Sequence, residues 1–393
     1  MNSQHIKDYC NGCGLCHAVL GTKLCASKKG FLHPDSISEK ELAFMNKICM
    51  SSGSFWNEKG KNTLWGDCLV DPFYAYSNNG ILRKKASSGG MVSEIVIHLI
   101  ENKKVDAIIQ TKVADNSQIL TKTVVNSEIE EIIDCCGSRY TISSPLYDIC
   151  NALEKGKKYA FIGKPCDVMS VRNWKRIDPV IDEQIPFLIS FICAGMPSKP
   201  AGERLLSSLN TSEEECINLV YRGNGWPGAT FSQSKNGTVE KMSYSDSWGK
   251  VLGRDVALAC RFCYDGIGEA ADISCGDGWY IKDNHPDFSE HDGRNVVFIR
   301  TLKGKELVDD MVKQGRITCL STNNPYEELK TIQQYQYDRR TTMRERLLAL
   351  KMCRRPTPLY SRKMLRSLGR EASVKTRFRV FFGTLKRIHQ NKI

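Results

Sequence analysis

Apolar positions recur with two different periods along the chain. Between residues 88 and 101 they follow one another at intervals of three and four, which predicts an amphipathic helix. Short runs rich in Val, Ile and Phe occupy residues 105–110, 159–163 and 186–191, and such runs predict strands. Because strands and helices alternate along this part of the chain, the pattern indicates an α/β or α+β core with a partly parallel sheet.

The second half of the chain changes character twice. Residues 220–244 are rich in Gly, Ser and Thr and alternate in polarity, which suggests hairpins. A strand at 296–299, a helix at 305–312 and a strand at 316–320 are expected to close the core, and the residues after about 330 have a helical pattern. We therefore expect an α+β fold with a mixed-sheet core. We expect three parts: a cysteine-rich N-terminal module at residues 1–70, the core at residues 71–328, and a helical region with a basic tail at residues 329–393.

Three cysteines of the N-terminal module share a tight spacing. Cys10, Cys13 and Cys16 form a C-x2-C-x2-C run with glycines inside it. Two-residue gaps let one loop direct three thiolates at a single iron-sulfur cluster, and glycines let backbone N–H groups turn toward the sulfurs. The spacing favours a cluster over structural zinc, whose sites usually pair C-x2-C with a distant second pair. Cys25 is the expected fourth ligand, and Cys49 is the alternative.

A second group of cysteines is dispersed along the core. Cys260 and Cys263 form a C-x2-C pair, while Cys166 and Cys193 each follow a predicted strand. Residues that follow parallel strands converge on one edge of a sheet. These four cysteines form a candidate second cluster site, with core packing as the alternative for Cys166 and Cys193. We interpret the isolated cysteines as small apolar packing residues, namely Cys68, Cys150, Cys216, Cys319 and Cys353.

A turn of small residues, Ser87-Ser88-Gly89-Gly90, opens the helix predicted at 88–101. Small residues at a helix N-terminus let backbone N–H groups approach an anion, and the helix dipole favours negative charge there. The turn therefore suits a phosphate group such as a flavin pyrophosphate. An ordinary loop with a helix cap is the alternative.

Composition and charge narrow the function classes. Seventeen cysteines without a secretory signal segment indicate metal binding or catalysis rather than a disulfide framework. No apolar run approaches the ~18 residues that cross a bilayer, so we expect a cytoplasmic protein. The net charge of +12 comes from residues 351–393, which hold 13 Lys and Arg against one acid, Glu371. Because the rest of the chain is neutral, no nucleic-acid partner is expected.

The basic tail also has an apolar stripe at helical spacing. Its five members are Val374, Phe378, Phe381, Leu385 and Ile388. An apolar stripe within a basic helix suits the surface of an anionic membrane, which would hold the protein peripherally at the inner face of the membrane. A helix that packs on the protein itself or on a partner is the alternative.

Taken in order, these motifs give the chain a family resemblance. The chain resembles the beta subunit of coenzyme F420-reducing hydrogenase and its relatives, which include chlorophyllide-type reductases. The resemblance runs from residue 10 to about residue 320. Its landmarks lie at residues 10–16, 88–90, 138–140, 163–166, 193–198, 225–228, 260–263 and 271–279.

The resemblance implies cofactors and site residues. It implies FAD in the core and two 4Fe-4S clusters, one of them in a ferredoxin-like N-terminal module. It adds Ser138, Arg139, Tyr140 and Lys164 to the residues expected to hold the cofactor. The N-terminal run departs from the ferredoxin pattern after Cys16, which leaves its fourth ligand open between Cys25 and Cys49.

The expected function is that of an FAD and iron-sulfur oxidoreductase. We expect it to pass electrons between a ferredoxin-like or deazaflavin carrier and a two-electron substrate, with surface-polysaccharide synthesis as one setting. An iron-sulfur cluster transfers one electron at a time, whereas a flavin transfers one or two. A protein with both cofactors can therefore connect one-electron transfer to a two-electron reaction. The alternative is a non-enzymatic, metal-stabilised scaffold in a polysaccharide or membrane assembly.

Overall fold

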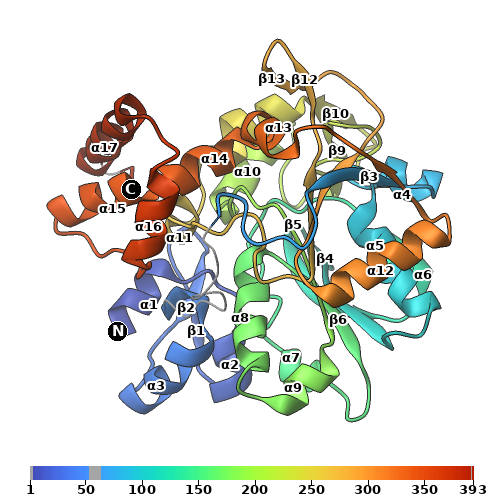
Figure 1. The fold of residues 1–393 in the computed structure, drawn as a ribbon, viewed down its shortest axis with the longest axis horizontal. Coiled ribbons are helices and arrows are strands. Elements are labelled where there is room, and N and C mark those ends of the chain that lie inside the picture. The colour runs from blue at the N-terminus through green and yellow to red at the C-terminus, as the bar shows by residue number, and fades with distance from the viewer. Residues whose placement is uncertain (1–2, 53–62, 391) are drawn as a thin grey trace.

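A mixed eight-stranded sheet organises the core, in the order β15-β3-β14-β11-β7-β6-β4-β5 (Figure 1). The computed structural model describes residues 3–52, 63–390 and 392–393. Strands β4, β6, β7 and β11 are parallel neighbours, and the remaining pairs are antiparallel. The strands are β3 Phe73–Ser77, β4 Ala107–Ala114, β5 Ser117–Asn126, β6 Tyr159–Gly163, β7 Phe187–Phe191, β11 Ile273–Asp277, β14 Asn295–Ile299 and β15 Ile317–Leu320.

Helices cover both faces of this sheet because its central strands are apolar on both sides. In β14, Val297 and Ile299 pack under α5 and α12, while Val296 and Phe298 belong to the opposite face. The helices around the core are α4 Gly80–Lys85, α5 Met91–Glu101, α6 Ile129–Asp134, α7 Ile149–Ala152, α8 Pro165–Lys175, α9 Pro179–Gln184, α10 Lys199–Ser208, α11 Leu258–Arg261 and α12 Leu302–Lys313. The strands and helices predicted from periodicity are present, with ends that differ by a few residues.

The N-terminal module packs against α8 and does not stand apart from the core. It comprises α1 Ser3–Tyr9, α2 Leu15–Leu20, β1 Leu24–Ala26, β2 Leu32–Pro34, α3 Glu39–Ile48 and the short helix η1 Met50–Ser52. Ser38 starts α3 with a capping box that includes Glu41. Met45 and Ile48 of α3 share one hydrophobic core with Val168 and Val171 of α8.

Residues 216–242 form the predicted hairpins. They give an antiparallel sheet of β8 Cys216–Val220, β9 Thr230–Ser234 and β10 Val239–Met242, next to the π-helical turn η2 Ser245–Val251 and the short helix η3 Leu252–Arg254. A second hairpin, β12 Tyr280–Lys282 and β13 His285–Asp287, projects from the top of the molecule in Figure 1.

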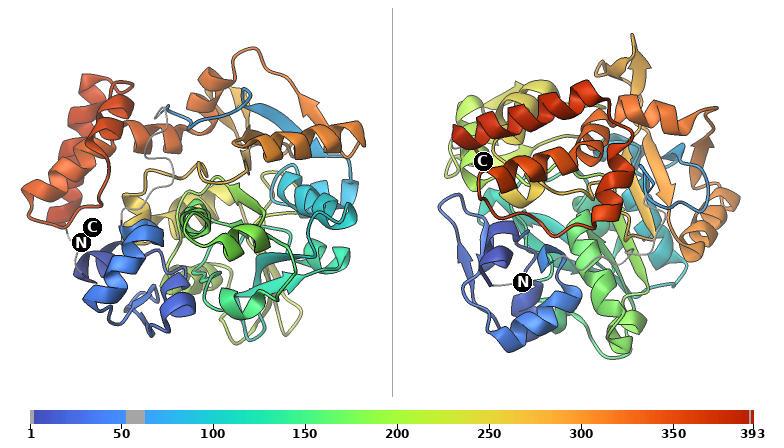
Figure 2. Two further views of the ribbon diagram at one scale, coloured as in Figure 1. Left: turned by 60° about the horizontal axis from the view of Figure 1, so that its bottom comes forward. Right: turned by 60° about the vertical axis from the view of Figure 1, so that its left-hand side comes forward.

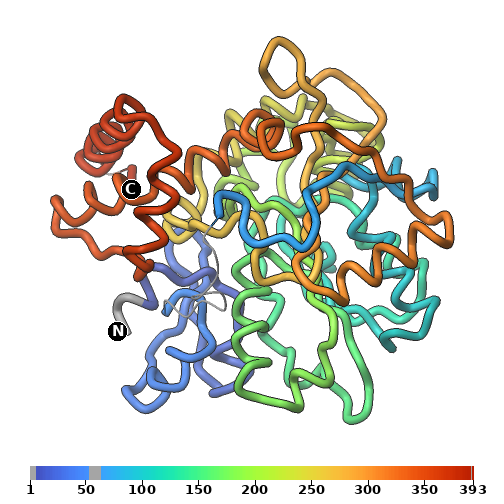
Figure 3. The backbone as a smooth tube through the Cα atoms, in the orientation of Figure 1, coloured from blue at the N-terminus to red at the C-terminus, as the bar shows by residue number. Residues whose placement is uncertain are grey.

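Five helices complete the chain and form an outer layer (Figure 2). They are α13 Pro325–Ile332, α14 Gln334–Thr341, α15 Met343–Met352, α16 Arg362–Gly369 and α17 Val374–His389. The backbone trace brings this layer back to the N-terminal module (Figure 3), where the Tyr9 hydroxyl donates to the carbonyl of Pro356 at 2.6 Å. No helix of the described residues is long and apolar enough to cross a membrane.

The apolar stripe of the tail is divided between the protein and solvent. Phe381, Leu385 and Ile388 pack into the core that α17 shares with α15. Val374 and Phe378 are 66% and 60% exposed and point away from it. The expected membrane contact relied on a single exposed apolar face, and this division leaves it without structural support.

A buried carboxylate joins three layers of the core. Asp272, 0% exposed, precedes β11 and accepts hydrogen bonds from Arg172 of α8 at 2.8 Å, from the backbone N–H of Leu188 at 2.8 Å and from Thr301 at 2.9 Å. We expect Asp272→Asn to lower the free energy of unfolding by about 3–5 kcal/mol, because it leaves the guanidinium of Arg172 without its buried counter-charge. Urea denaturation measures this change.

Asp309→Asn is the matched control, because its carboxylate pairs with Lys305 on the exposed side of α12. An exposed pair contributes about 0.5 kcal/mol or less. Equal effects of the two substitutions would contradict the role given to Asp272.

Candidate functional site

The carboxyl edge of the central sheet collects two of the predicted cysteines. β6 ends at Gly163 and β7 at Phe191, and the two strands are parallel neighbours. Cys166 lies in the first turn of α8, directly after β6, and Cys193 follows β7 by two residues. Both cysteines therefore reach the same edge of the sheet, as their positions after strands predicted.

Cys260 and Cys263 reach this edge from the segment around α11. The backbone N–H of Cys193 donates to the carbonyl of Gly266 at 2.8 Å, which ties that segment to the end of β7. Burial raises the pKa of Cys193 to about 11, and the thiol of Cys260 also raises it. Burial raises the pKa of Cys263 to about 12, with smaller contributions from the thiols of Cys260 and Cys193.

The thiol of Cys166 completes this second cysteine set. Burial, and then Asp167, raise its pKa, and the thiols of Cys193 and Cys263 add to the effect. Backbone N–H groups meet the sulfurs as well, because Met196 donates to Cys260 Sγ at 3.3 Å. Hydrogen bonds of this kind stabilise cluster thiolates.

The N-terminal module brings together four thiols of its own. Cys10 follows α1, Cys13 and Cys16 lie around the start of α2, and Cys49 ends α3. Burial raises the pKa of all four thiols, to about 12 for Cys16, and the thiol of Cys49 further raises the pKa of each of the other three. We call these four residues the first cysteine set.

Glycines shape the loop that carries the first set. Gly12 and Gly14 have φ angles of 70° and 90°, which side chains disfavour. A Cβ at Gly14 would lie 2.6 Å from the Cα of Tyr147, so this position also has no room for one. The N–H of Gly12 donates to Cys10 Sγ at 3.3 Å.

Cys25 lies apart from the first set. It is the middle residue of β1 and pairs with His33 of β2. In the described part of the chain, the thiols that act on Cys10, Cys13 and Cys16 belong to this group of three and to Cys49. The structure thus brings Cys49, the alternative fourth residue, to the place expected for Cys25.

A single buried acid connects the two sets. Asp167 is 0% exposed, pairs with Lys164 Nζ at 2.7 Å and raises the pKa of both Cys13 and Cys166, after the effect of burial. A cavity of about 40 Å³ lies nearby, and its lining includes Asn11 of the N-terminal module together with Cys166, Cys260 and Cys263. The two sets therefore lie on either side of one buried region.

The donor sets fit iron-sulfur clusters. All seventeen cysteines lie in the described residues and are free thiols. Among those residues, no three His, Cys, Asp or Glu side chains converge as one metal ion requires. A single zinc ion would need its ligand sulfurs about 3.8 Å apart, from bonds of about 2.3 Å. A cluster fills the space between its thiolates and holds them farther apart.

The residues predicted to hold a flavin are only partly brought together. The N–H of Ser138 donates to Ser87 Oγ at 2.6 Å, so two of the predicted segments are in contact. Arg139 donates to the carbonyl of Leu219 at 3.1 Å, and burial lowers its pKa. Tyr140 packs against Trp248, with ring centroids 4.9 Å apart.

Ser88 and Gly89, in the small-residue turn before α5, contact other parts of the protein. Ser88 donates to the carbonyl of Arg294 at 2.7 Å, and Asn295 accepts from the N–H of Met91 at the start of α5. A Cβ at Gly89 would lie 2.8 Å from the Cα of Arg294. The close approach of β14 therefore explains this glycine without a ligand. Lys164 also lies elsewhere, beside the second cysteine set.

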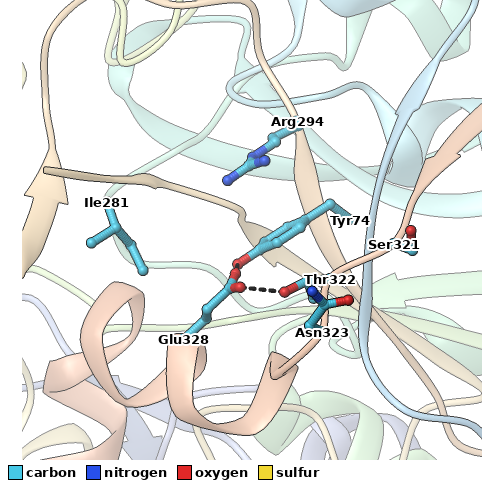
Figure 4. Close-up of a pocket in the computed structure, with 7 residues that line it drawn as sticks. All are labelled: Tyr74, Ile281, Arg294, Ser321, Thr322, Asn323 and Glu328. Atoms are coloured by element: carbon cyan, nitrogen blue, oxygen red, sulfur yellow. Dashed lines mark hydrogen bonds between the residues drawn. The ribbon is translucent and has the colours of Figure 1, made fainter.

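A cavity of about 470 Å³ is lined by residues of the sheet face opposite α5, including Tyr74 (Figure 4). The Arg294 guanidinium lies between the rings of Tyr74 and Tyr280, 3.9 and 3.8 Å from their centroids. Tyr74 donates to Glu328 at 2.6 Å, and Thr322 donates to the other oxygen of that carboxylate. None of the predicted site residues lines this cavity.

Sequence reasoning missed Asp167 and Arg339. Asp167 left a signal, because it follows Lys164 by three residues at a helix start, the spacing of a capping box. Arg339 left none. It lies on α14, in the region predicted as a separate helical part, and its guanidinium donates to the carbonyls of Cys193 and Cys260.

Comparison with known protein families identifies most of the folded core. Residues 72–151 match the N-terminal family model described as coenzyme F420 hydrogenase/dehydrogenase, beta subunit. Residues 156–324 match the C-terminal model of the same description. Together the two matches span more than half of the chain.

Individual relatives share low identity over most of this region. The chain is 26% identical to the coenzyme F420 hydrogenase subunit beta of Methanococcus voltae over 254 residues, which cover 61% of this chain and 79% of that one. It is 24% identical over 247 residues to the F420-dependent formate dehydrogenase subunit beta of Methanocaldococcus jannaschii, covering 61% and 59%. It is 18% identical over 305 residues to 7-hydroxymethyl chlorophyll a reductase of Oryza sativa, covering 77% and 61%.

A solved structure has the same fold. One chain of the F420-reducing [NiFe] hydrogenase complex from Methanosarcina barkeri superposes with a TM-score of 0.52 at 21% identity, over 71% of this chain and 94% of that one. With two successive family matches and a shared fold, this chain belongs to the coenzyme F420 hydrogenase/dehydrogenase beta-subunit family.

Proposed function

We propose that this protein is an oxidoreductase that passes electrons between a ferredoxin-like or deazaflavin carrier and a two-electron substrate by means of two 4Fe-4S clusters and FAD. The observation that carries this proposal is the pair of sets of four free thiols, all buried or partly buried, that lie side by side at the sheet edge. The names of the matched relatives, which are hydrogenase, dehydrogenase and reductase subunits, support an oxidoreductase role.

The ligands proposed for the clusters follow from this grouping. Cys10, Cys13, Cys16 and Cys49 would hold the first cluster, and Cys166, Cys193, Cys260 and Cys263 would hold the second. Without iron, each of these thiols has a raised pKa and is therefore protonated at neutral pH. Bound iron favours the thiolate, so metal binding and folding support each other. When bound, the clusters supply one-electron transfer, and the flavin joins it to two-electron chemistry.

The flavin is proposed to bind near the contact between Ser87 and Ser138. Arg139 supports this position, because it is a largely buried cation that forms no ion pair with a carboxylate of the described residues. The phosphate groups of FAD, or the anionic reduced flavin, would provide a negative charge to pair with Arg139. Tyr140 and Trp248 offer aromatic faces beside it.

The carrier is proposed to be a ferredoxin-like protein or a reduced deazaflavin. Coenzyme F420 in the names of several relatives supports the deazaflavin. The relatives act on different substrates, since one is a formate dehydrogenase subunit and another a chlorophyll reductase. They give no support to the expected role in surface-polysaccharide synthesis.

The spectrum and metal content of anaerobically purified protein test the proposal. We expect about eight iron atoms and one FAD per chain, with a flavin absorption band and broad iron-sulfur absorption. A colourless protein that contains zinc would instead identify the metal-stabilised scaffold and refute the enzyme.

Replacement of single cysteines tests the first cysteine set. We expect Cys49→Ser to lose about four of the eight iron atoms while FAD stays bound, because the flavin residues lie on other segments. Cys25→Ser is the matched control and should keep all eight. Iron loss in the Cys25 variant but not in the Cys49 variant would reverse the assignment.

Arg139→Gln tests the flavin position. Loss of a charge-assisted contact should weaken FAD binding about tenfold or more and leave the iron content intact. Arg176→Gln, at the exposed end of α8, is the control for loss of one positive charge. FAD released by heat denaturation and quantified by fluorescence provides the measurement, and normal FAD content in the Arg139 variant would reject the site.

A further inference from the structure

Arg339 is a cation buried without an acidic partner. It is 1% exposed, and its guanidinium donates to the carbonyls of Cys260 and Cys193 at 3.2 Å each and to Gln336 Oε1 at 2.6 Å. Its Nε has no hydrogen-bond partner, and no carboxylate of the described residues forms an ion pair with it. The next residue, Arg340, is equally buried but pairs with Glu269 at 2.6 Å. Burial of an unpaired cation is strongly unfavourable unless opposite charge lies nearby.

The negative charge available to Arg339 is that of the second cysteine set. Three of its four thiols, Cys193, Cys260 and Cys263, lie close enough for the guanidinium to oppose the effect of burial on their pKa values. Thiolates bonded to iron carry this negative charge permanently. The environment of Arg339 is therefore balanced when the second set holds a cluster.

The chain makes room for this contact. A Cβ at Gly266 would lie 1.9 Å from Arg339 Nη2 and 2.2 Å from Gln336 Oε1. A side chain at this position would displace Arg339 and Gln336 from the carbonyl of Cys193. Figure 1 shows α14 between the sheet and the C-terminal helices, and α14 begins ten residues beyond the end of the family match at residue 324.

Among the described residues, no such cation acts on the first cysteine set. The groups that act most strongly on its thiols are the thiols themselves, backbone N–H groups and the acid Asp167, with no lysine or arginine among them. Lys164, the other cation near the second set, is paired with Asp167 at 2.7 Å. In the described part of the chain, the unpaired positive charge of Arg339 thus lies beside the second cysteine set.

We propose that Arg339, supplied by α14 from outside the family core, is the counter-charge of the second cysteine set and gives the cluster held there a higher reduction potential than the cluster of the first set. The inference rests on the proposed function, because it requires both clusters. Reduction adds one electron to a cluster and makes no bond, so a nearby positive charge stabilises the reduced state over the oxidised one. In half-reduced protein, the electron therefore resides at the second set.

A redox titration of the anaerobically purified holoprotein, followed by electron paramagnetic resonance, tests this assignment. The Cys49→Ser variant identifies the signal of the second cluster. We expect Arg339→Gln to lower the potential of that cluster by at least a tenfold change in the one-electron reduction equilibrium, about 59 mV. Arg339→Lys should retain most of the wild-type value, and the potential of the first cluster should not change.

Two further variants separate charge from structure. Arg344→Gln removes one positive charge at an exposed position of α15 and should leave the potential near the wild-type value. Gly266→Ala keeps the charge of Arg339 but displaces it, so it should lower the potential, and it decides the question if the Arg339→Gln protein does not fold. Iron absent from the second set of the wild-type protein would refute the proposed function. A full complement of iron with an unshifted potential in both the Arg339→Gln and Gly266→Ala proteins would refute only the role of Arg339.

Discussion

Burial of polar sulfur and charge at one edge of the central sheet is the constraint on which the rest of the structure depends. Eight thiols, Asp167, Lys164 and Arg339 lie in a buried or partly buried region, where an ionised group without a partner is disfavoured. The protein meets this constraint with pairing. Lys164 neutralises Asp167, backbone N–H groups face several sulfurs, and Arg339 faces the second cysteine set.

The parallel arrangement of β6 and β7 creates this edge. Both strands end at the same edge of the sheet. The residues that follow them are therefore close in space although they are far apart in the sequence. The first set reaches the same region because α3 packs on α8, the helix whose first turn carries Cys166 and Asp167. A single helix therefore carries Cys166 of the second set and packs against the helix that ends at Cys49 of the first set.

Elements outside the family core complete the site. The match to the family ends at residue 324, yet α14 supplies Arg339 and Gln336 to the carbonyl of Cys193. The outer layer of helices also packs on the N-terminal module, where Tyr9 contacts Pro356. The sequence left open whether the tail contacts a membrane or packs on the protein itself. In α17, Ile388 is buried and Phe381 and Leu385 are partly buried against α15, whereas Val374, Phe378 and Phe382 are exposed.

The sequence by itself determined the local elements and most of the chemistry. Periodicity predicted α5, β6, β7 and β14, because a strand or helix that is buried on a given face must repeat its apolar residues with its own period. Two-residue spacings grouped the neighbouring cysteines, and the positions of Cys166 and Cys193 after strands predicted their convergence. Tertiary structure decided what depends on contacts between distant segments. It brought Cys49 rather than Cys25 to the first set, enclosed Gly89 against β14, and placed a cation from residue 339 beside cysteines 76 to 146 residues away. No local pattern carries that information, since a long-range contact is selected by the packing of whole elements and not by the residues next to it in the chain.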